Sequence, residues 1–166
     1  MHSVENIILL AKTRHMEELQ QLSFSTDFVE TIGLIIHQLQ AERGASSLYV
    51  ASSGQSFAQE RANLVTQNQG LEQRFIKALH LHLQHNQTAG AKQLTLISWI
   101  LLGFNELSNF RHQVTLLQTQ PANCMTVFTR QIGYLVSLIF EITDSSVDSK
   151  LSKYLVALYN LVQAKE

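Results

Sequence analysis

The scarcity of helix-breaking residues is the feature that most limits the folds open to this chain. Its 166 residues include one proline, Pro121, and seven glycines. A sandwich or barrel of short strands needs a turn about every 8–12 residues, which this composition does not supply. Apolar residues recur instead at helical spacing throughout the chain. We therefore predict an all-α protein.

Short polar clusters divide the helical pattern into segments. Serine, aspartate, glycine and proline in these clusters provide the signals that begin and end helices. The predicted helices cover residues 3–22, 27–52, 56–86, 91–118, 122–143 and 147–165. Because the connections are short, consecutive helices should lie antiparallel. The length suits one domain, so we expect an antiparallel helical bundle of about six helices.

Charge and cysteine content exclude several kinds of partner. Charged residues make up 15% of the chain, and twelve basic residues face thirteen acidic ones, which favours neither direct nucleic-acid binding nor a membrane partner. Cys124 is the single cysteine, so we expect it to be a small buried side chain. The N-terminus lacks the basic start of a signal peptide, and the most apolar stretch, 94–104, is shorter than the roughly 20 residues of a membrane span. We predict a cytoplasmic location.

One arginine interrupts the apolar stripe of segment 27–52. At about 100° per residue, Arg43 falls within the arc set by Leu39 and Val50, with the hydroxyl of Ser46 one turn later. A buried guanidinium needs a partner, and its planar fork suits an oxyanion such as nitrate, carboxylate or phosphate. The alternative is an ordinary ion pair with a carboxylate of another helix. The available carboxylates are those of Glu30, Glu60, Glu72 and Glu106.

Two further arginines occupy similar positions. Arg61 lies in the apolar arc of segment 56–86, and Arg111 lies on the apolar side of segment 91–118. Arginines that converge on one cavity with Arg43 would indicate a bound anion, because none of them can lose its proton. Salt bridges are the alternative for both, with Glu106 as one partner for Arg111.

Other constellations point to no catalysis. His80, His82 and His85 cluster without a nearby cysteine or carboxylate, so we expect no metal site. The chain contains no phosphate-binding loop, no GxSxG or HExxH motif and no legible nucleophile–base set. We therefore predict neither an enzyme nor a cofactor.

The run from Leu39 to Gly54, with Glu-Arg-Gly at its centre and Phe57 and Glu60 after it, resembles the opening of the NIT domain. NIT domains sense nitrate and nitrite in bacterial signalling and antitermination regulators. The clear resemblance covers about residues 35–80. It implies an all-helical fold, usually longer than this chain, in which the arginine of Glu-Arg-Gly, here Arg43, binds the anion.

The end of the chain departs from the family pattern. In the family, a late helix supplies a second arginine from a segment resembling Lys-Glu-x-x-Gly-x-Glu-Arg, whereas this chain ends at Ala164-Lys165-Glu166. We therefore interpret residues 1–166 as the N-terminal part of a longer sensing domain, without the output domain. In family members that lack a membrane span, that output domain resembles an RNA-binding antiterminator.

The leading hypothesis is a sensor that binds nitrate or nitrite and relays a helix rearrangement to a downstream regulatory domain. Arg43 would bind the anion, and Ser46, Ser47 and either Arg61 or Arg111 would add donors. The alternative is a helical homodimerisation or protein-interaction module without a small ligand, because segment 91–118 is apolar almost all round.

Overall fold

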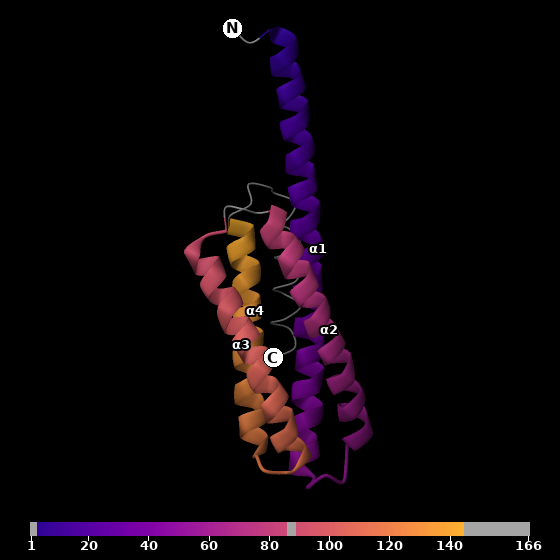
Figure 1. Ribbon diagram of the computed structural model, residues 1–166. Coiled ribbons are helices and arrows are strands. Elements are labelled where there is room, and N and C mark those ends of the chain that lie inside the picture. The colour runs from indigo at the N-terminus through magenta and orange to yellow at the C-terminus, as the bar shows by residue number, and fades with distance from the viewer. Residues whose placement is uncertain (1–2, 86–88, 145–166) are drawn as a thin grey trace.

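The computed structural model describes residues 3–85 and 89–144, and this part of the chain forms four helices and no strand. The helices are α1 (Val4–Ala51), α2 (Ala58–His85), α3 (Ala91–Thr115) and α4 (Pro121–Asp144). They run up and down beside one another as a bundle (Figure 1). The all-α prediction is confirmed here, whereas the number of helices was wrong. The sixth predicted segment, 147–165, lies outside the described residues.

The predicted break near residues 23–27 does not occur, because polar side chains bond within the helix. The hydroxyl of Thr26 donates to the carbonyl of Leu22 at 2.9 Å, and the hydroxyl of Thr31 donates to the carbonyl of Asp27 at 2.9 Å. A hydroxyl bonded to the carbonyl one turn back satisfies itself without ending the helix. The predicted helices 3–22 and 27–52 are therefore one helix of 48 residues.

The predicted junctions near Gly54 and Pro121 agree with the structure, whereas the one at 144–148 falls almost wholly outside the described residues. After α1, the N–H of Gly54 donates to the carbonyl of Tyr49 at 2.9 Å, and Ser53 and Gly54 have φ values of 54° and 81°. A left-handed glycine of this kind commonly ends a helix. α4 begins at Pro121, whose missing N–H has no partner to lose in a first helical turn.

The core lies between the part of α1 from Phe28 onward and the other helices. α1 packs against α2 and α4, and α3 packs against α4. The largest buried apolar side chains come from all four helices and include Phe28, Ile32, Ile35, Leu39, Phe75, Ile100, Leu107, Phe128, Leu135 and Leu138. Cys124 is buried among them, as expected.

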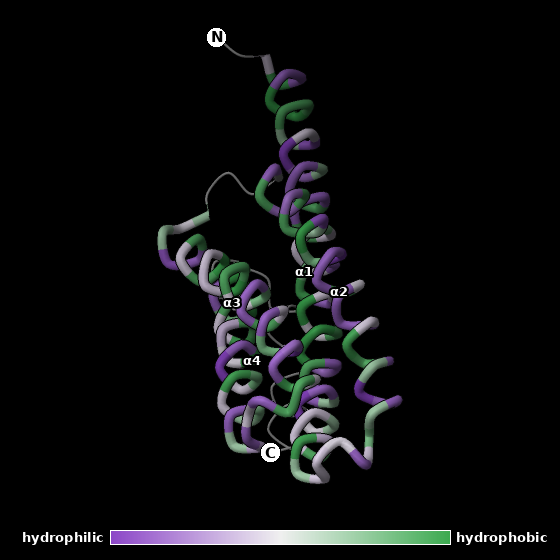
Figure 2. The backbone as a smooth tube through the Cα atoms, turned by 60° about the horizontal axis from the view of Figure 1, so that its bottom comes forward, coloured by the Kyte–Doolittle hydropathy of each residue, from purple (hydrophilic) through white to green (hydrophobic). Residues whose placement is uncertain are grey.

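The first part of α1 extends beyond the bundle. Residues 3–21 are all exposed, and the earliest buried residue of the helix is Phe28. Figure 1 shows this segment projecting past the ends of the neighbouring helices. It carries exposed apolar residues, including Ile7, Leu10 and Leu19. Green stretches of the backbone tube in Figure 2 mark hydrophobic residues in this segment. The bundle itself therefore begins near Phe28.

α4 is the most apolar of the described helices. Its segment Pro121–Thr143 is long and apolar enough to cross a membrane by length and composition alone. The core helix of a soluble bundle meets the same criterion. Here Phe128, Leu135 and Leu138 are fully buried within the bundle, whereas Met125 and Phe140 of the same segment are exposed.

Candidate functional site

Arg43 lies at the seam between α1 and α4. Its Nη1 donates to the hydroxyl oxygen of Thr129, on α4, at 2.8 Å. The side chain is half-buried, in contrast to the fully buried position that the helical spacing predicts. The reason is that the buried series Phe28, Ile32, Ile35 and Leu39 continues three residues on at Glu42, so that Glu42 enters the core and Arg43 lies at its edge.

Two small hydroxyl residues follow Arg43 on α1. Ser46 is buried, and its hydroxyl has no hydrogen-bond partner within the described residues. Ser47 is half-buried. Beside Arg43, a Cβ added at Gly44 would meet no atom within 4 Å. This stretch of α1 therefore combines a half-buried arginine with an exposed glycine and a buried hydroxyl.

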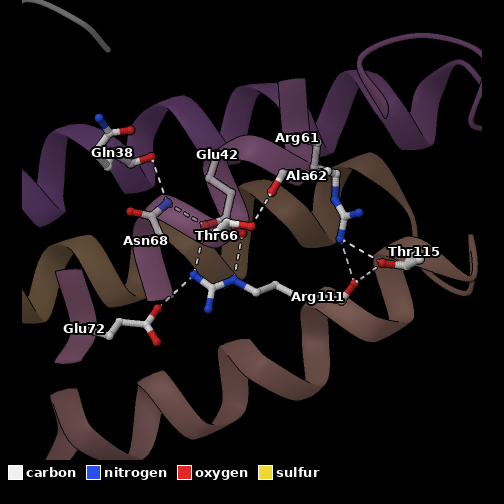
Figure 3. Close-up of polar contacts among 9 residues, drawn as sticks. All are labelled: Gln38, Glu42, Arg61, Ala62, Thr66, Asn68, Glu72, Arg111 and Thr115. Atoms are coloured by element: carbon white, nitrogen blue, oxygen red, sulfur yellow. Dashed lines mark hydrogen bonds and ion pairs between the residues drawn. The ribbon is translucent and has the colours of Figure 1, made fainter. Parts of the chain in front are cut away.

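Arg111 lies in a separate, buried cluster of charges. Its Nε donates to Oε1 of Glu42 at 2.8 Å, and its Nη2 donates to Oε2 at 2.9 Å, so the pair is bidentate. Nη2 also lies 2.8 Å from Oε1 of Glu72 on α2. Figure 3 shows the guanidinium between the two carboxylates. The cluster therefore joins α1, α2 and α3 through ionic side chains.

Asn68 supplies a further hydrogen-bond donor to this cluster. Its amide nitrogen donates to Oε2 of Glu42 at 2.7 Å and to the carbonyl of Gln38 at 3.2 Å (Figure 3). Glu42 thus accepts hydrogen bonds from two helices while its side chain is 0% exposed. A buried carboxylate is stable in this setting because charged and neutral donors replace the water that it has lost.

Arg61 belongs to the same side of the bundle as Arg111. Its Nη2 donates to the carbonyl of Arg111 at 2.7 Å and to the hydroxyl of Thr115 at 3.1 Å. Its guanidinium carbon lies 5.3 Å from the ring centroid of Tyr49, within cation–π range. The structure therefore brings Arg61 and Arg111 together, but it places both among protein partners.

The pKa values of these groups follow their surroundings. Burial lowers the pKa of Arg61. Burial also acts to lower the pKa of Arg111, but the hydrogen bonds and charge of Glu42, together with Glu72, raise it well above its usual range. Burial raises the pKa of Glu72 in spite of its arginine partner. The surroundings of Arg111 therefore favour its protonated form, whereas burial opposes the ionised form of Glu72.

Glu42, Asn68 and Thr129 were not predicted as site residues from the sequence. Glu42 had a visible signal, because it lies next to Arg43 inside the same broad apolar arc. Asn68 and Thr129 had none, since their partners lie 26 and 86 residues away in the chain. Among the alternative carboxylates, Glu72 pairs with Arg111, and Glu106 pairs with Arg130 of α4 on the surface.

The histidines behave differently from one another. His82 is buried and stacks on Phe28 with ring centroids 4.8 Å apart, whereas His80 is exposed. Nε2 of His82 lies 2.9 Å from the amide nitrogen of Gln93. Among the described residues, no group of three or more histidine, cysteine, aspartate or glutamate side chains could hold a metal ion.

The chain has recognisable relatives. Residues 34–166 match the family described as nitrate and nitrite sensing. The nitrate regulatory protein of Klebsiella oxytoca is 28% identical over 157 residues, which are 94% of this chain and 39% of that protein. The structure of the NasR transcription antiterminator superposes with a TM-score of 0.81 at 25% identity, over 96% of this chain and 43% of that one. The chain thus spans less than half the length of either relative.

Proposed function

Because this chain belongs to the nitrate- and nitrite-sensing (NIT) family, we propose that it is a signal-sensing module that binds nitrate or nitrite at Arg43. The named relatives are regulatory proteins, which supports a sensing role in place of catalysis. The observation that carries the proposal is the place of Arg43 at the α1–α4 seam, half-buried beside Gly44. A permanently charged, planar donor in such a position suits a small planar oxyanion.

The hydroxyls of Ser46 and Ser47 are the further donors that we propose on α1. Ser46 supports this role because its buried hydroxyl has no partner within the described residues, and such a group gains most from a new acceptor. Arg61 and Arg111 would join the site only by exchanging their present partners, Glu42 and Thr115 among them, for the anion.

The signal would pass through the helices. A ligand shifts a conformational equilibrium only by binding one arrangement better than another. An anion at Arg43 would favour the packing of α1 against α4 that best surrounds it. We propose that this change is relayed to a regulatory output domain outside these 166 residues, in the cytoplasm. In this proposal the module itself binds neither nucleic acid nor a membrane.

Calorimetric titration with nitrate tests the proposal. The protein should bind nitrate saturably, and Arg43→Ala should abolish the binding. Arg130→Ala is the matched control, because Arg130 is an exposed arginine of α4 that pairs with Glu106. An absence of binding by the unmodified protein, or equal binding by the Arg43 variant, would contradict the proposal.

A second candidate function is a homodimerisation module. The outer side of α3 supports it, since Leu94, Trp99 and Leu102 are 44%, 48% and 60% exposed. Apolar side chains gathered on one helix commonly mark an interface. Sedimentation equilibrium of the protein decides this, because a strict monomer at high concentration would exclude it.

A further inference from the structure

Thr129 differs from the other threonines of α4 in its hydrogen bonding. Thr126 and Thr143 of the same helix donate their hydroxyls to the carbonyls of Ala122 and Ile139, one turn back. Within the described part of the chain, Thr129 makes no such bond to its own helix. Its hydroxyl oxygen instead accepts from Nη1 of Arg43 at 2.8 Å.

This arrangement leaves a second donor beside the guanidinium. A hydroxyl that accepts one hydrogen bond retains its own hydrogen for another acceptor. The Thr129 hydroxyl and the Arg43 guanidinium therefore form an adjacent pair of donors from two helices. Donors converging in this way suit an oxyanion, whose oxygens accept several hydrogen bonds.

The pair is open to solvent, since Thr129 is exposed and Arg43 is half-buried. Gly44 follows Arg43 on α1, and Gly133 lies one turn after Thr129, on the same side of α4. A Cβ added at either glycine would meet no atom within 4 Å. Both glycines are exposed, so an anion could reach the pair from solvent without displacing the core.

We propose that Thr129 is a residue of the anion site, donating its hydroxyl hydrogen to an oxygen of the nitrate or nitrite bound at Arg43. The inference rests on the proposed function and extends it, because it assigns α4 as the second wall of the site. The bound anion then bridges α1 and α4 directly. Anion binding would therefore act on the contact between α1 and α4 that Arg43 and Thr129 already make.

Substitution at Thr129 tests this inference by nitrate calorimetry at constant chloride concentration. Thr129→Val replaces the hydroxyl with a methyl group of similar size and should weaken nitrate binding about tenfold, as expected for one hydrogen bond to a charged partner. Thr129→Ser keeps the hydroxyl and should bind within about twofold of the unmodified protein, a change smaller than one such bond. Thr126→Val is the matched control, because that hydroxyl is occupied by its own helix.

The outcomes separate the inference from the function on which it rests. If Arg43→Ala abolishes binding while Thr129→Val binds as tightly as the unmodified protein, the function stands and the role of Thr129 is wrong. Tighter binding by Thr129→Val would also overturn the inference, because it would show that the hydroxyl competes with the anion for Arg43. Absence of nitrate binding by the unmodified protein overturns both. Circular dichroism and Thr129→Ala, a second variant without the hydroxyl, guard against a folding defect.

Discussion

At the scale of single residues, Glu42 is a fully buried carboxylate whose stability depends on its hydrogen-bond donors. Its carboxylate is inaccessible to water and accepts two hydrogen bonds from Arg111 and one from Asn68. Bidentate arginine–carboxylate pairs are among the stronger protein hydrogen bonds. In a core, such a pair stabilises the fold only while both partners are present, because either one alone is a buried unpaired charge.

Glu42→Ala should therefore lower the free energy of unfolding by about 3–5 kcal/mol, since it strands the Arg111 cation with only Glu72 to face it. Urea unfolding measures this. The control is Glu106→Ala, which removes the surface partner of Arg130 and should cost at most about 1 kcal/mol. Equal losses in the two variants would show that the buried pair is not a special contributor to stability.

Residue positions were only partly predictable from the sequence. Helical spacing selected Arg43, but an arc of this width also admits Glu42, three residues after Leu39. In the structure Glu42 takes the buried position, because α1 meets Asn68 of α2 and Arg111 of α3 there. The choice between two adjacent charged residues, Glu42 and Arg43, therefore depended on partners that are distant in the chain.

At the scale of helices, the contact between α3 and α4 depends on one glycine. Gly103 faces Gln131, whose amide nitrogen donates to the carbonyl of Ile100 at 3.0 Å. A Cβ at position 103 would lie 1.8 Å from Oε1 of Gln131. Gln131 is buried, so its amide cannot move aside without losing that hydrogen bond.

Gly103→Ala should consequently be less stable than Gly133→Ala by about 1–3 kcal/mol, the cost of disrupting a buried hydrogen bond. The two substitutions share the same gain in helix propensity, so their difference isolates the displacement of Gln131. A Cβ at Gly133 meets open space. Chemical denaturation of both variants gives the comparison, and equal stability would mean that Gln131 relocates freely.

Helix boundaries were predictable wherever backbone geometry decides them. Gly54 and Pro121 end and begin helices because their φ preferences leave few alternatives. The polar cluster at residues 23–27 contains no such residue, and its hydroxyl groups can either cap a helix or bond within it. Local sequence cannot choose between these options, since both satisfy the same groups.

At the scale of the whole molecule, His82 lies where three helices meet. It projects from α2, stacks on Phe28 of α1 and lies against Gln93 of α3. Burial lowers the pKa of His82 below its ordinary value of 6.5. The folded bundle therefore favours the neutral imidazole, whereas the unfolded chain takes up a proton more readily.

A depressed histidine pKa gives stability that is present above pH 6.5 and is lost as the pH falls through the folded-state value. We expect the unfolding free energy to decline over that acidic range, and His82→Gln to flatten the decline. His80→Gln is the control, because His80 is exposed on the same helix and should leave the slope unchanged. Urea unfolding between pH 7.5 and 5.5, roughly the range where histidine titrates, makes the comparison. A slope that His82→Gln leaves intact would contradict this assignment.

The fold class was predictable because helical spacing persists through the described chain, but the pattern of neighbours was not. Short connections correctly placed α1 beside α2 and α3 beside α4. The packing of α1 against α4 joins helices that are distant in sequence. It depends on which apolar faces fit together, and it creates the seam on which the proposed site depends.

The length of α1 gives that seam a mechanical consequence. A helix rises about 1.5 Å per residue, so Val4 lies about 58 Å along the axis from Arg43. About half of that span projects freely past the bundle. Acting as a lever arm with its fulcrum near Arg43, such a rod would swing its far end by about 1 Å for each degree of tilt at the proposed anion site. A small tilt of α1 within the bundle would thus be amplified into a larger displacement of its projecting end.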